Sequence, residues 1–145
     1  MAKYKTAYKF RCFGIYQRKP VRFLVVPVFI WNSPKRGDMD EFVVTLAVKN
    51  TSLQRIAPAL PTTNGTWTEI AHSDHNPTSG HDIYDPNDTK QFHVDVNHPY
   101  KSNQYSRVYT KLANGSPPKP VGKAANLAKK VLVAKKERFL DDFLP

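Results

Sequence analysis

Hydrophobic residues recur with the period of a β-strand in the first 112 residues and with the period of an α-helix only after residue 122. Side chains alternate between the two faces of a strand, so a two-residue period or a short continuous apolar run indicates a strand. One late switch to the helical period indicates an amphipathic helix that follows the sheet. Strands first and a helix last favour the α+β class. We therefore predict an antiparallel sheet of about five or six strands with one C-terminal amphipathic helix.

Turn-forming residues divide the chain between these segments. Pro27 interrupts an apolar run and favours an edge position or a bulge there. Residues 50–65 have the composition of a long loop, and residues 113–122 form a Pro/Gly-rich linker before a helix over 123–143. A chain of 145 residues suits a single domain over 1–145. The predicted strands are 3–13, 21–31, 41–48, 66–72, 90–97 and 104–111.

The net charge of +10 is unevenly distributed. Residues 72–98 contain five Asp and one Lys, a net charge of −4, so the rest of the chain carries +14. Basic residues near both ends can bind phosphates, and tyrosines beside cations can stack on bases. We expect nucleic acid as the partner, RNA preferred, although a ribosome or an acidic protein would fit the same charge. The candidate nucleic-acid-binding residues are Lys3, Lys5, Lys9, Arg11, Tyr105, Arg107, Tyr109, Lys111, Lys129 and Lys130.

Membrane and disulfide-rich classes do not fit the sequence. The longest apolar run, Phe23 to Trp31, is far shorter than the ~20 residues that span a bilayer. The basic N-terminus lacks the hydrophobic segment of a secretory signal. The single Cys12 excludes an internal disulfide framework and a multi-cysteine zinc site. We expect a cytoplasmic protein with no membrane partner.

All five histidines lie within residues 72–98 together with five aspartates. Histidine suits proton transfer near neutral pH. Two histidines flanking a phosphodiester can cleave RNA without a metal, since one accepts the 2′-OH proton and the other protonates the leaving oxygen. An aspartate would orient each imidazole, and Arg107 or Lys111 would stabilise the developing charge. The catalytic candidates are His72, Asp74, His75, His81, Asp82, His93 and Asp95.

A divalent metal is the rival chemistry, since imidazole and carboxylate together suit zinc, manganese, iron or nickel. His93 and Asp95 share one face of a predicted strand, which is favourable ligand geometry. The alternative without chemistry is a polar loop whose Asp, Asn and Pro residues form turns and whose histidines lie on the surface. No cofactor is firmly indicated, and a divalent metal is possible.

The stretch from Trp67 to Tyr84 resembles a small bacterial and archaeal family related to the TumE-like toxins of toxin–antitoxin loci. Trp67 matches the family's tryptophan, Asp74 its motif aspartate, and His81 and Asp82 fall near its later His and Asp. The C-terminal KKERFLDDF also resembles the family's closing helix. The resemblance implies a toxin-type ribonuclease that an acidic, antitoxin-like protein would neutralise.

The segment that begins Asp74-His75-Asn76-Pro77 is also similar to the HNH nuclease pattern. This resemblance implies that His75 activates water, that Asn87 orients the motif and that His98 helps to hold one divalent metal. The pattern requires a helix that carries the last ligand, whereas residues 90–97 alternate as a strand.

The sequence thus predicts a small basic RNA-directed protein, with a toxin-type ribonuclease as the first hypothesis. The alternatives are a non-enzymatic nucleic-acid-binding module of a ribonucleoprotein, phage or anti-phage assembly, and an HNH-like metal-dependent nuclease.

Overall fold

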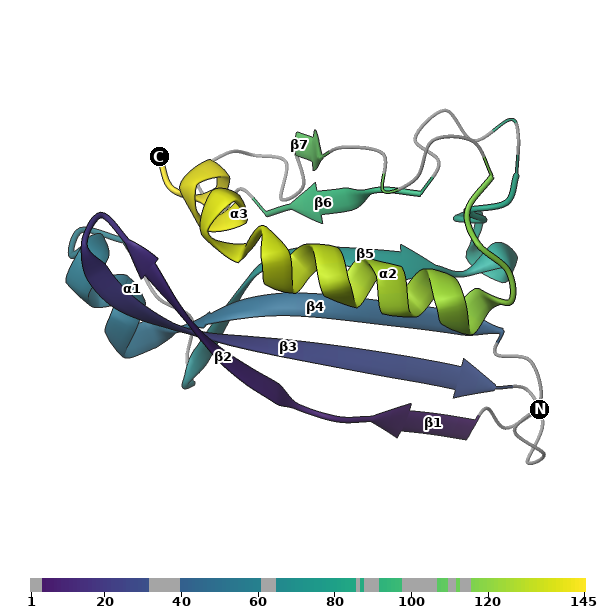
Figure 1. Ribbon diagram of the computed structural model, residues 1–145, viewed down its shortest axis with the longest axis horizontal. Helices are drawn as coiled ribbons and strands as arrows, with labels where there is room; N and C mark the ends of the chain where they lie inside the picture. The colour runs from purple at the N-terminus through teal and green to yellow at the C-terminus, as the bar shows by residue number, and fades with distance from the viewer. Residues whose placement is uncertain are drawn as a thin grey trace.

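The computed structural model describes residues 4–31, 40–60, 65–85, 87, 92–97, 107–109, 112 and 116–145. In this part of the chain, seven strands form one antiparallel sheet in which β3, β4, β5, β6 and β7 follow one another as neighbours (Figure 1). β1 and β2 both pair with β3, so the sheet is six strands wide. The strands are β1 (Tyr4–Ala7), β2 (Phe10–Tyr16), β3 (Lys19–Trp31), β4 (Glu41–Lys49), β5 (Trp67–His75), β6 (Val94–Val96) and β7 (Arg107–Tyr109).

Three α-helices and one 3-10 helix accompany the described strands. The α-helices are α1 (Asn50–Ile56), α2 (Val121–Ala134) and α3 (Lys136–Phe143), and the 3-10 helix is η1 (Pro77–Ser79). Figure 1 shows α2 and α3 lying across one face of the sheet, while α1 lies at the end where β2 turns into β3. The prediction of an α+β fold with an antiparallel sheet is confirmed.

Pro27 explains why the strand predicted over 3–13 is two strands. β3 runs unbroken through Pro27, which is opposite Val44 of β4. On its other side, the Pro27 carbonyl accepts a hydrogen bond from the Tyr8 N–H at 3.3 Å, and β1 and β2 are separated at residues 8 and 9. Because proline has no N–H to offer this neighbour, the ladder is interrupted there. The predicted irregularity thus lies in the adjacent strand.

β2 and β3 are joined by a two-residue turn without glycine. Gln17 and Arg18 have φ angles of 49° and 66°. Two-residue hairpins favour positive φ at both central positions, which Asn-Gly sequences supply most easily. The hairpin therefore forms with two residues that are poorly suited to its backbone.

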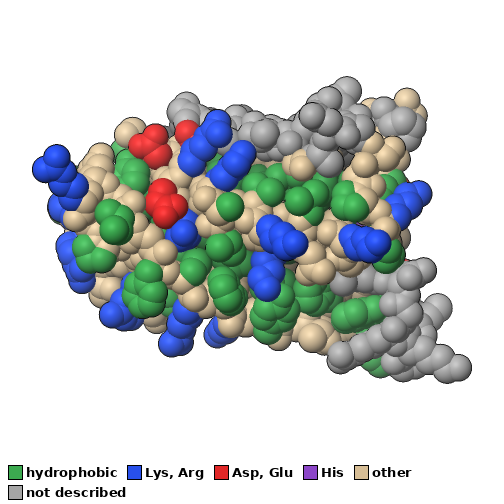
Figure 2. Space-filling view, in the orientation of Figure 1, with side chains coloured by type: hydrophobic (Ala, Val, Ile, Leu, Met, Phe, Trp, Pro, Cys, Tyr) green, Lys and Arg blue, Asp and Glu red, His purple; other side chains and the backbone are tan. Residues whose placement is uncertain are grey.

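The core lies between α2, α3 and one face of the sheet, here called the covered face. Phe23, Phe42 and Leu46 pack on it against Ala128 and Leu132 of the helices. Since side chains alternate along each strand, the intervening residues lie on the opposite face, here called the open face. Figure 2 views the molecule from the helix side; Lys and Arg side chains are scattered over it and no His is visible.

The C-terminal helical segment differs from the single helix predicted over 123–143. α2 begins at Val121 and ends at Ala134, and Lys135, with φ −113° and ψ 23°, separates it from α3. This change of direction lets Phe139, Leu140 and Phe143 reach the core. The helical period predicted an amphipathic segment here, but it could not show the bend between α2 and α3.

The predicted loop over 50–65 is also wrong in its first half, because Asn50–Ile56 is the helix α1. Leu53 of this helix is buried in the core. The Asn50 side chain donates to the Gly65 carbonyl at 2.8 Å and accepts from the Thr68 hydroxyl at 2.5 Å. These contacts hold the helix against the start of β5.

Gly14 of β2 permits α3 to approach the sheet closely. A Cβ built there would lie 2.8 Å from a Phe23 ring carbon and 2.8 Å from Glu137 Oε1. Tyr16, two residues along, donates to Asp141 Oδ1 at 2.6 Å, and burial with this hydrogen bond raises the pKa of Tyr16 to about 12. β2 thus anchors the last helix.

Replacement of the turn residues Gln17-Arg18 with Asn-Gly should stabilise the protein. Each non-glycine residue at positive φ costs on the order of 1 kcal/mol, so we expect the free energy of unfolding to rise by about 1–2 kcal/mol. Urea denaturation followed by circular dichroism measures this change. An Ala-Ala replacement is the control, and an Asn-Gly variant no more stable than the Ala-Ala variant would contradict the turn geometry.

Candidate functional site

A β-bulge in β5 determines which of its side chains reach the open face. Leu46 of β4 is opposite Ala71, but its neighbour Ala47 is opposite Glu69, so Ile70 is an extra residue in β5. Ile70 and Ala71 are consecutive, and both are buried in the core. A bulge shifts the alternation by one residue. His72 therefore lies on the same face of the sheet as Glu69, although the two residues are three positions apart in the sequence.

The neighbouring strand adds an aspartate and a histidine to this position. Asp95 of β6 is directly opposite His72 of β5. His93 lies two residues before Asp95, so the alternation of an extended chain places it on the same face. Asp74, two residues after His72, is also on this face. Two adjacent strands thus bring two carboxylates and two imidazoles together.

A capped turn brings a third histidine back to β5. The Asn76 side chain accepts hydrogen bonds from the N–H groups of Thr78 and Ser79 at 3.1 and 3.2 Å. Gly80 then adopts a φ of 87°, which favours glycine. The backbone of His81 exchanges two hydrogen bonds with Asn76, so its side chain lies beside the end of β5.

These five side chains form one contiguous group, here called the His/Asp cluster: His72, Asp74, His81, His93 and Asp95. Asp95 lies between two imidazoles, with Oδ1 3.2 Å from His93 Nε2 and Oδ2 3.5 Å from His72 Nε2. Asp74 Oδ1 is 3.5 Å from His81 Nε2, and the rings of His81 and His93 meet edge to face at 5.0 Å. Three of the five histidines in the segment 72–98, with two of its aspartates, therefore also lie together in space.

The members of the cluster differ in their access to solvent. The His93 side chain is only 3% exposed, whereas His81 is 23% and Asp74 31% exposed. His93 is thus suited to position Asp95, and His81 and Asp74 are accessible to a bound molecule. Glu69, which sequence reasoning missed, places Oε2 3.7 Å from His72 Nδ1. Glu69 lies close to His72 because of the bulge, and no sequence pattern predicted that bulge.

His72, Asp74 and Asp95 could hold a metal ion. Each offers one ligand atom, and the three atoms lie within 4.8 Å of one another. The 3.5 Å separation between His72 Nε2 and Asp95 Oδ2 exceeds the ~2.9 Å of a good hydrogen bond. It is close to the ~3.4 Å between two ligands of a tetrahedral ion with bonds of ~2.0–2.1 Å. Imidazole with carboxylates suits zinc, manganese, iron or nickel.

His75 belongs to the core and not to the cluster. It is buried on the covered face, stacked on Phe42 at 6.0 Å and edge to face with Tyr84 at 5.5 Å. Its Nδ1 accepts a hydrogen bond from the Ile83 N–H at 3.2 Å. Burial lowers the pKa of His75, so the ring is held neutral. Asp82 lies near His75 and not in the cluster. Its Oδ1 accepts a hydrogen bond from the Tyr84 N–H at 2.9 Å and is 3.8 Å from His75 Nδ1.

The residues carried by the HNH resemblance are placed differently. His75 is in the core, Asn87 is exposed with its N–H donating to Asp85 Oδ1 at 2.9 Å, and His98 lies outside the described residues. Within the described residues, His75 and Asn87 share no hydrogen bond, ion pair or group of metal ligands.

The predicted nucleic-acid-binding residues do not form one surface in the described part of the chain. Lys5 and Arg11 lie on the open face, opposite Ile30 and Leu24 of β3. Lys129 of α2 is on the other side of the sheet, where its Nζ donates to the Tyr8 hydroxyl at 3.0 Å and lies 5.2 Å from the Phe10 ring centre.

The other predicted nucleic-acid-binding residues are dispersed along the chain. Lys9 is exposed at the break between β1 and β2, and Lys130 is exposed on α2. Arg107 and Tyr109 are the first and last residues of strand β7. Lys3, Tyr105 and Lys111 lie outside the described residues.

Comparison of the chain with protein-family models, curated proteins and solved structures gave no match. Among the described helices, none is long and apolar enough to cross a membrane.

The buried His75 should make the protein acid-sensitive. The unfolded chain binds a proton near the ordinary His pKa of about 6.5, but the folded chain resists it, so stability falls as pH drops through this value. His75→Asn retains a hydrogen-bond acceptor for Ile83 and removes the titration. We expect the variant to lose less unfolding free energy than the wild type between pH 7.5 and 5.5 in urea titrations. Parallel losses in the two proteins would contradict a neutral, buried His75.

Proposed function

We propose that the protein is a nuclease that cleaves single-stranded RNA at the His/Asp cluster, with one divalent cation held by His72, Asp74 and Asp95. The observation that supports this proposal is the convergence of the three ligand atoms within 4.8 Å. They come from two neighbouring strands, and the paired register of His72 with Asp95 fixes their spacing. Two histidines, His81 and His93, adjoin the same group.

The electrostatics of the cluster favour a cation. The close contacts described in the cluster each join an imidazole nitrogen to a carboxylate oxygen, and Glu69 adds a further carboxylate at its edge. Partly buried carboxylates that lie close together repel one another unless a positive charge is present. A divalent cation would supply this charge, and it would also attract a phosphodiester.

The chemistry needs groups that move protons and a charge that stabilises the transition state. A cation held by His72, Asp74 and Asp95 would stabilise the charge that develops on the phosphate and would make a water acidic enough to serve as one proton-transfer group. His81, the more exposed histidine, is the second. The 2′-OH loses its proton and its oxygen attacks phosphorus; the bond to the 5′ oxygen breaks and that oxygen is protonated. His93, buried against Asp95, acts as a positioning residue.

The overall charge of the chain supports a polyanionic substrate. The chain outside residues 72–98 carries +14, and Lys5 and Arg11 lie on the same face as the cluster. Such charge binds phosphates without regard to sequence. A role as a toxin follows from the family resemblance alone, and an acidic protein partner follows from that resemblance and from the net charge; both stay predictions.

Cleavage of RNA should depend on the metal and on Asp95. We expect the purified protein to cleave a labelled single-stranded RNA, EDTA to abolish cleavage, and addition of Mn²⁺, Zn²⁺, Ni²⁺ or Fe²⁺ to restore it. Asp95→Asn keeps the shape of the side chain and removes its charge, so the rate should fall at least about 100-fold with loss of bound metal. Gel electrophoresis and elemental analysis measure the two effects. Asp85→Asn, at an exposed aspartate outside the cluster, is the matched control.

Three results would contradict the proposal. Cleavage that resists EDTA but is lost in His81→Ala would leave acid–base catalysis without a metal. Binding of RNA without cleavage would indicate a non-enzymatic binding module. Equal cleavage by the wild type and Asp95→Asn would show that the cluster is not the reaction centre.

A further inference from the structure

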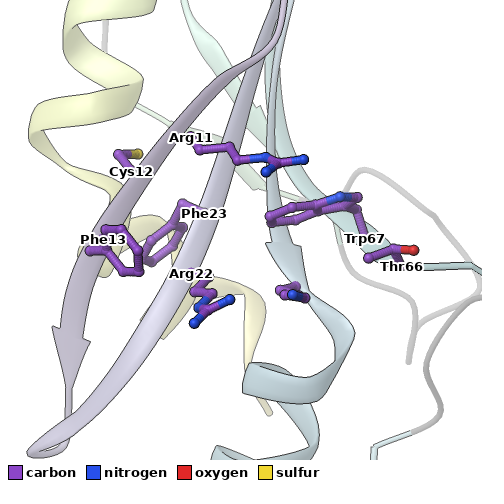
Figure 3. Close-up of a pocket in the computed structure, with 8 residues that line it drawn as sticks. Arg11, Cys12, Phe13, Arg22, Phe23, Thr66 and Trp67 are labelled. Carbon is purple, nitrogen blue, oxygen red and sulfur yellow. The ribbon is translucent and has the colours of Figure 1, made fainter.

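A second feature of the open face is a pocket of about 250 Å³ near the β2–β3 hairpin. Its side chains come from three parts of the sheet: Arg11 and Phe13 from β2, Arg22 from β3, and Lys49 and Trp67 from the paired ends of β4 and β5. Figure 3 shows Arg11 extending toward the indole ring of Trp67, with Phe13 and Arg22 at the other side of the hollow. Distant segments of sequence therefore build one site.

The pocket has the charge of an anion-binding site. Arg11, Arg22 and Lys49 line it, and among the described residues no carboxylate does. A neighbouring hollow of about 310 Å³ shares Phe13 and Arg22 and adds Arg55. Arginine binds phosphate through two parallel hydrogen bonds, so two arginines in one pocket favour a phosphate group over a monatomic anion such as chloride.

The pocket also presents aromatic rings. Phe13 is 70% exposed, and the Arg22 guanidinium carbon lies 5.7 Å from the centre of its ring. An exposed phenylalanine beside cations gains little from the fold, but it can stack on a nucleobase. Trp67 offers a second, half-buried ring. The cationic side chains thus suit the phosphate of a nucleotide, and the aromatic rings suit its base.

The register of β4 and β5 relates the pocket to the His/Asp cluster. Lys49 is opposite Trp67 at the pocket, and Thr45 is opposite His72 at the cluster. Four residues of β4 separate the two positions, about 13 Å along the strand. On β4, Ala47 and Thr45 present small side chains along this path, and Glu69 of β5, opposite Ala47, borders it next to His72. A few nucleotides of single strand could thus lie across the open face from the pocket to the cluster.

We infer that Arg11, Phe13, Arg22, Lys49 and Trp67 form a nucleotide-binding subsite that holds single-stranded RNA and directs it toward the His/Asp cluster. The arginines and Lys49 bind the backbone phosphate, and Phe13 and Trp67 stack on the bases. The inference takes its ligand from the proposed function, but binding can be measured without cleavage.

The binding test uses a fluorescein-labelled RNA of twelve nucleotides and fluorescence anisotropy in EDTA, at several salt concentrations. We expect Arg11→Gln/Arg22→Gln to weaken binding at least about tenfold and to reduce the salt slope by about 1.4, or ~0.7 for each lost phosphate contact. Phe13→Leu should weaken binding at least about fivefold. DNA of the same sequence forms a second arm, since the phosphate and stacking contacts serve both while the 2′-OH does not. Because the subsite contacts phosphates and bases, the pocket variants should lower the affinity for this DNA by a similar factor, and a DNA affinity that they leave unchanged would overturn the subsite.

Matched controls remove the same groups from the other side of the molecule. Lys123→Gln/Lys135→Gln removes two charges from exposed positions near the two ends of α2, and Phe10→Leu replaces a ring on the covered side. These variants should bind RNA nearly as the wild type does. An equal loss of affinity in both double variants would indicate diffuse attraction and overturn the subsite, as would no loss in Arg11→Gln/Arg22→Gln.

The two proposals can fail separately. If the pocket variants lose RNA affinity but no RNA is cleaved, the subsite stands and the nuclease proposal fails. If RNA is cleaved and the pocket variants keep the wild-type affinity and KM, the subsite fails and the nuclease proposal stands. Displacement of RNA from the wild type by an acidic peptide, with tighter binding of that peptide than of RNA, would overturn the RNA assignment in favour of an acidic protein partner.

Discussion

The packing of α2 and α3 on one face of the sheet is the constraint on which the remaining structure depends. Ala124, Ala125 and Ala128 are buried where α2 meets the sheet, and their small side chains let the helix lie close to Phe23, Phe42 and Leu46. Burial of this apolar area supplies the main stabilisation of the fold. Because the covered face satisfies this requirement, residues on the open face are free to carry charge. The His/Asp cluster and the cationic pocket both lie there.

The bulge at Ile70 and Ala71 links that packing to the chemistry. Both residues are buried in the core, so the chain uses one extra residue of β5 to fill the space under the helices. Without it, a regular alternation from Glu69 would place His72 and Asp74 on the covered face, among apolar side chains. A buried carboxylate without a partner is costly, so such a register would be unstable. The same local irregularity therefore improves the core and presents the candidate ligands, a combination often found where a strand re-aims a functional side chain.

Much of the fold could be predicted from the sequence, and the reasons are local. The apolar runs before and after residues 32–40 predicted β3 and β4, and the late helical period predicted the amphipathic segment that forms α2 and α3, because burial determines those patterns. The Gln17-Arg18 turn lacks the glycine that marks such hairpins, and α1 is held by Asn50 and Leu53, whose partners are distant in sequence. For the candidate site, composition indicated the segment and the residue types. It could not separate His75 from His72, because the bulge and the stacking on Phe42 and Tyr84 decide which ring is buried.

The distribution of charge on the open face also restricts the kind of ligand that could use both sites. The pocket attracts anions through Arg11, Arg22 and Lys49, whereas the cluster, with Asp74 and Asp95, attracts cations. A single small anion would bind the pocket and be repelled by the metal-free cluster. A chain of phosphates can occupy the pocket with one phosphate and approach the cluster with another, once a cation has neutralised the carboxylates. The two sites are about 13 Å apart along β4, so a polymer of nucleotides can reach both at once. The affinity gained at the pocket would offset the cost of bringing a second phosphate to the aspartates.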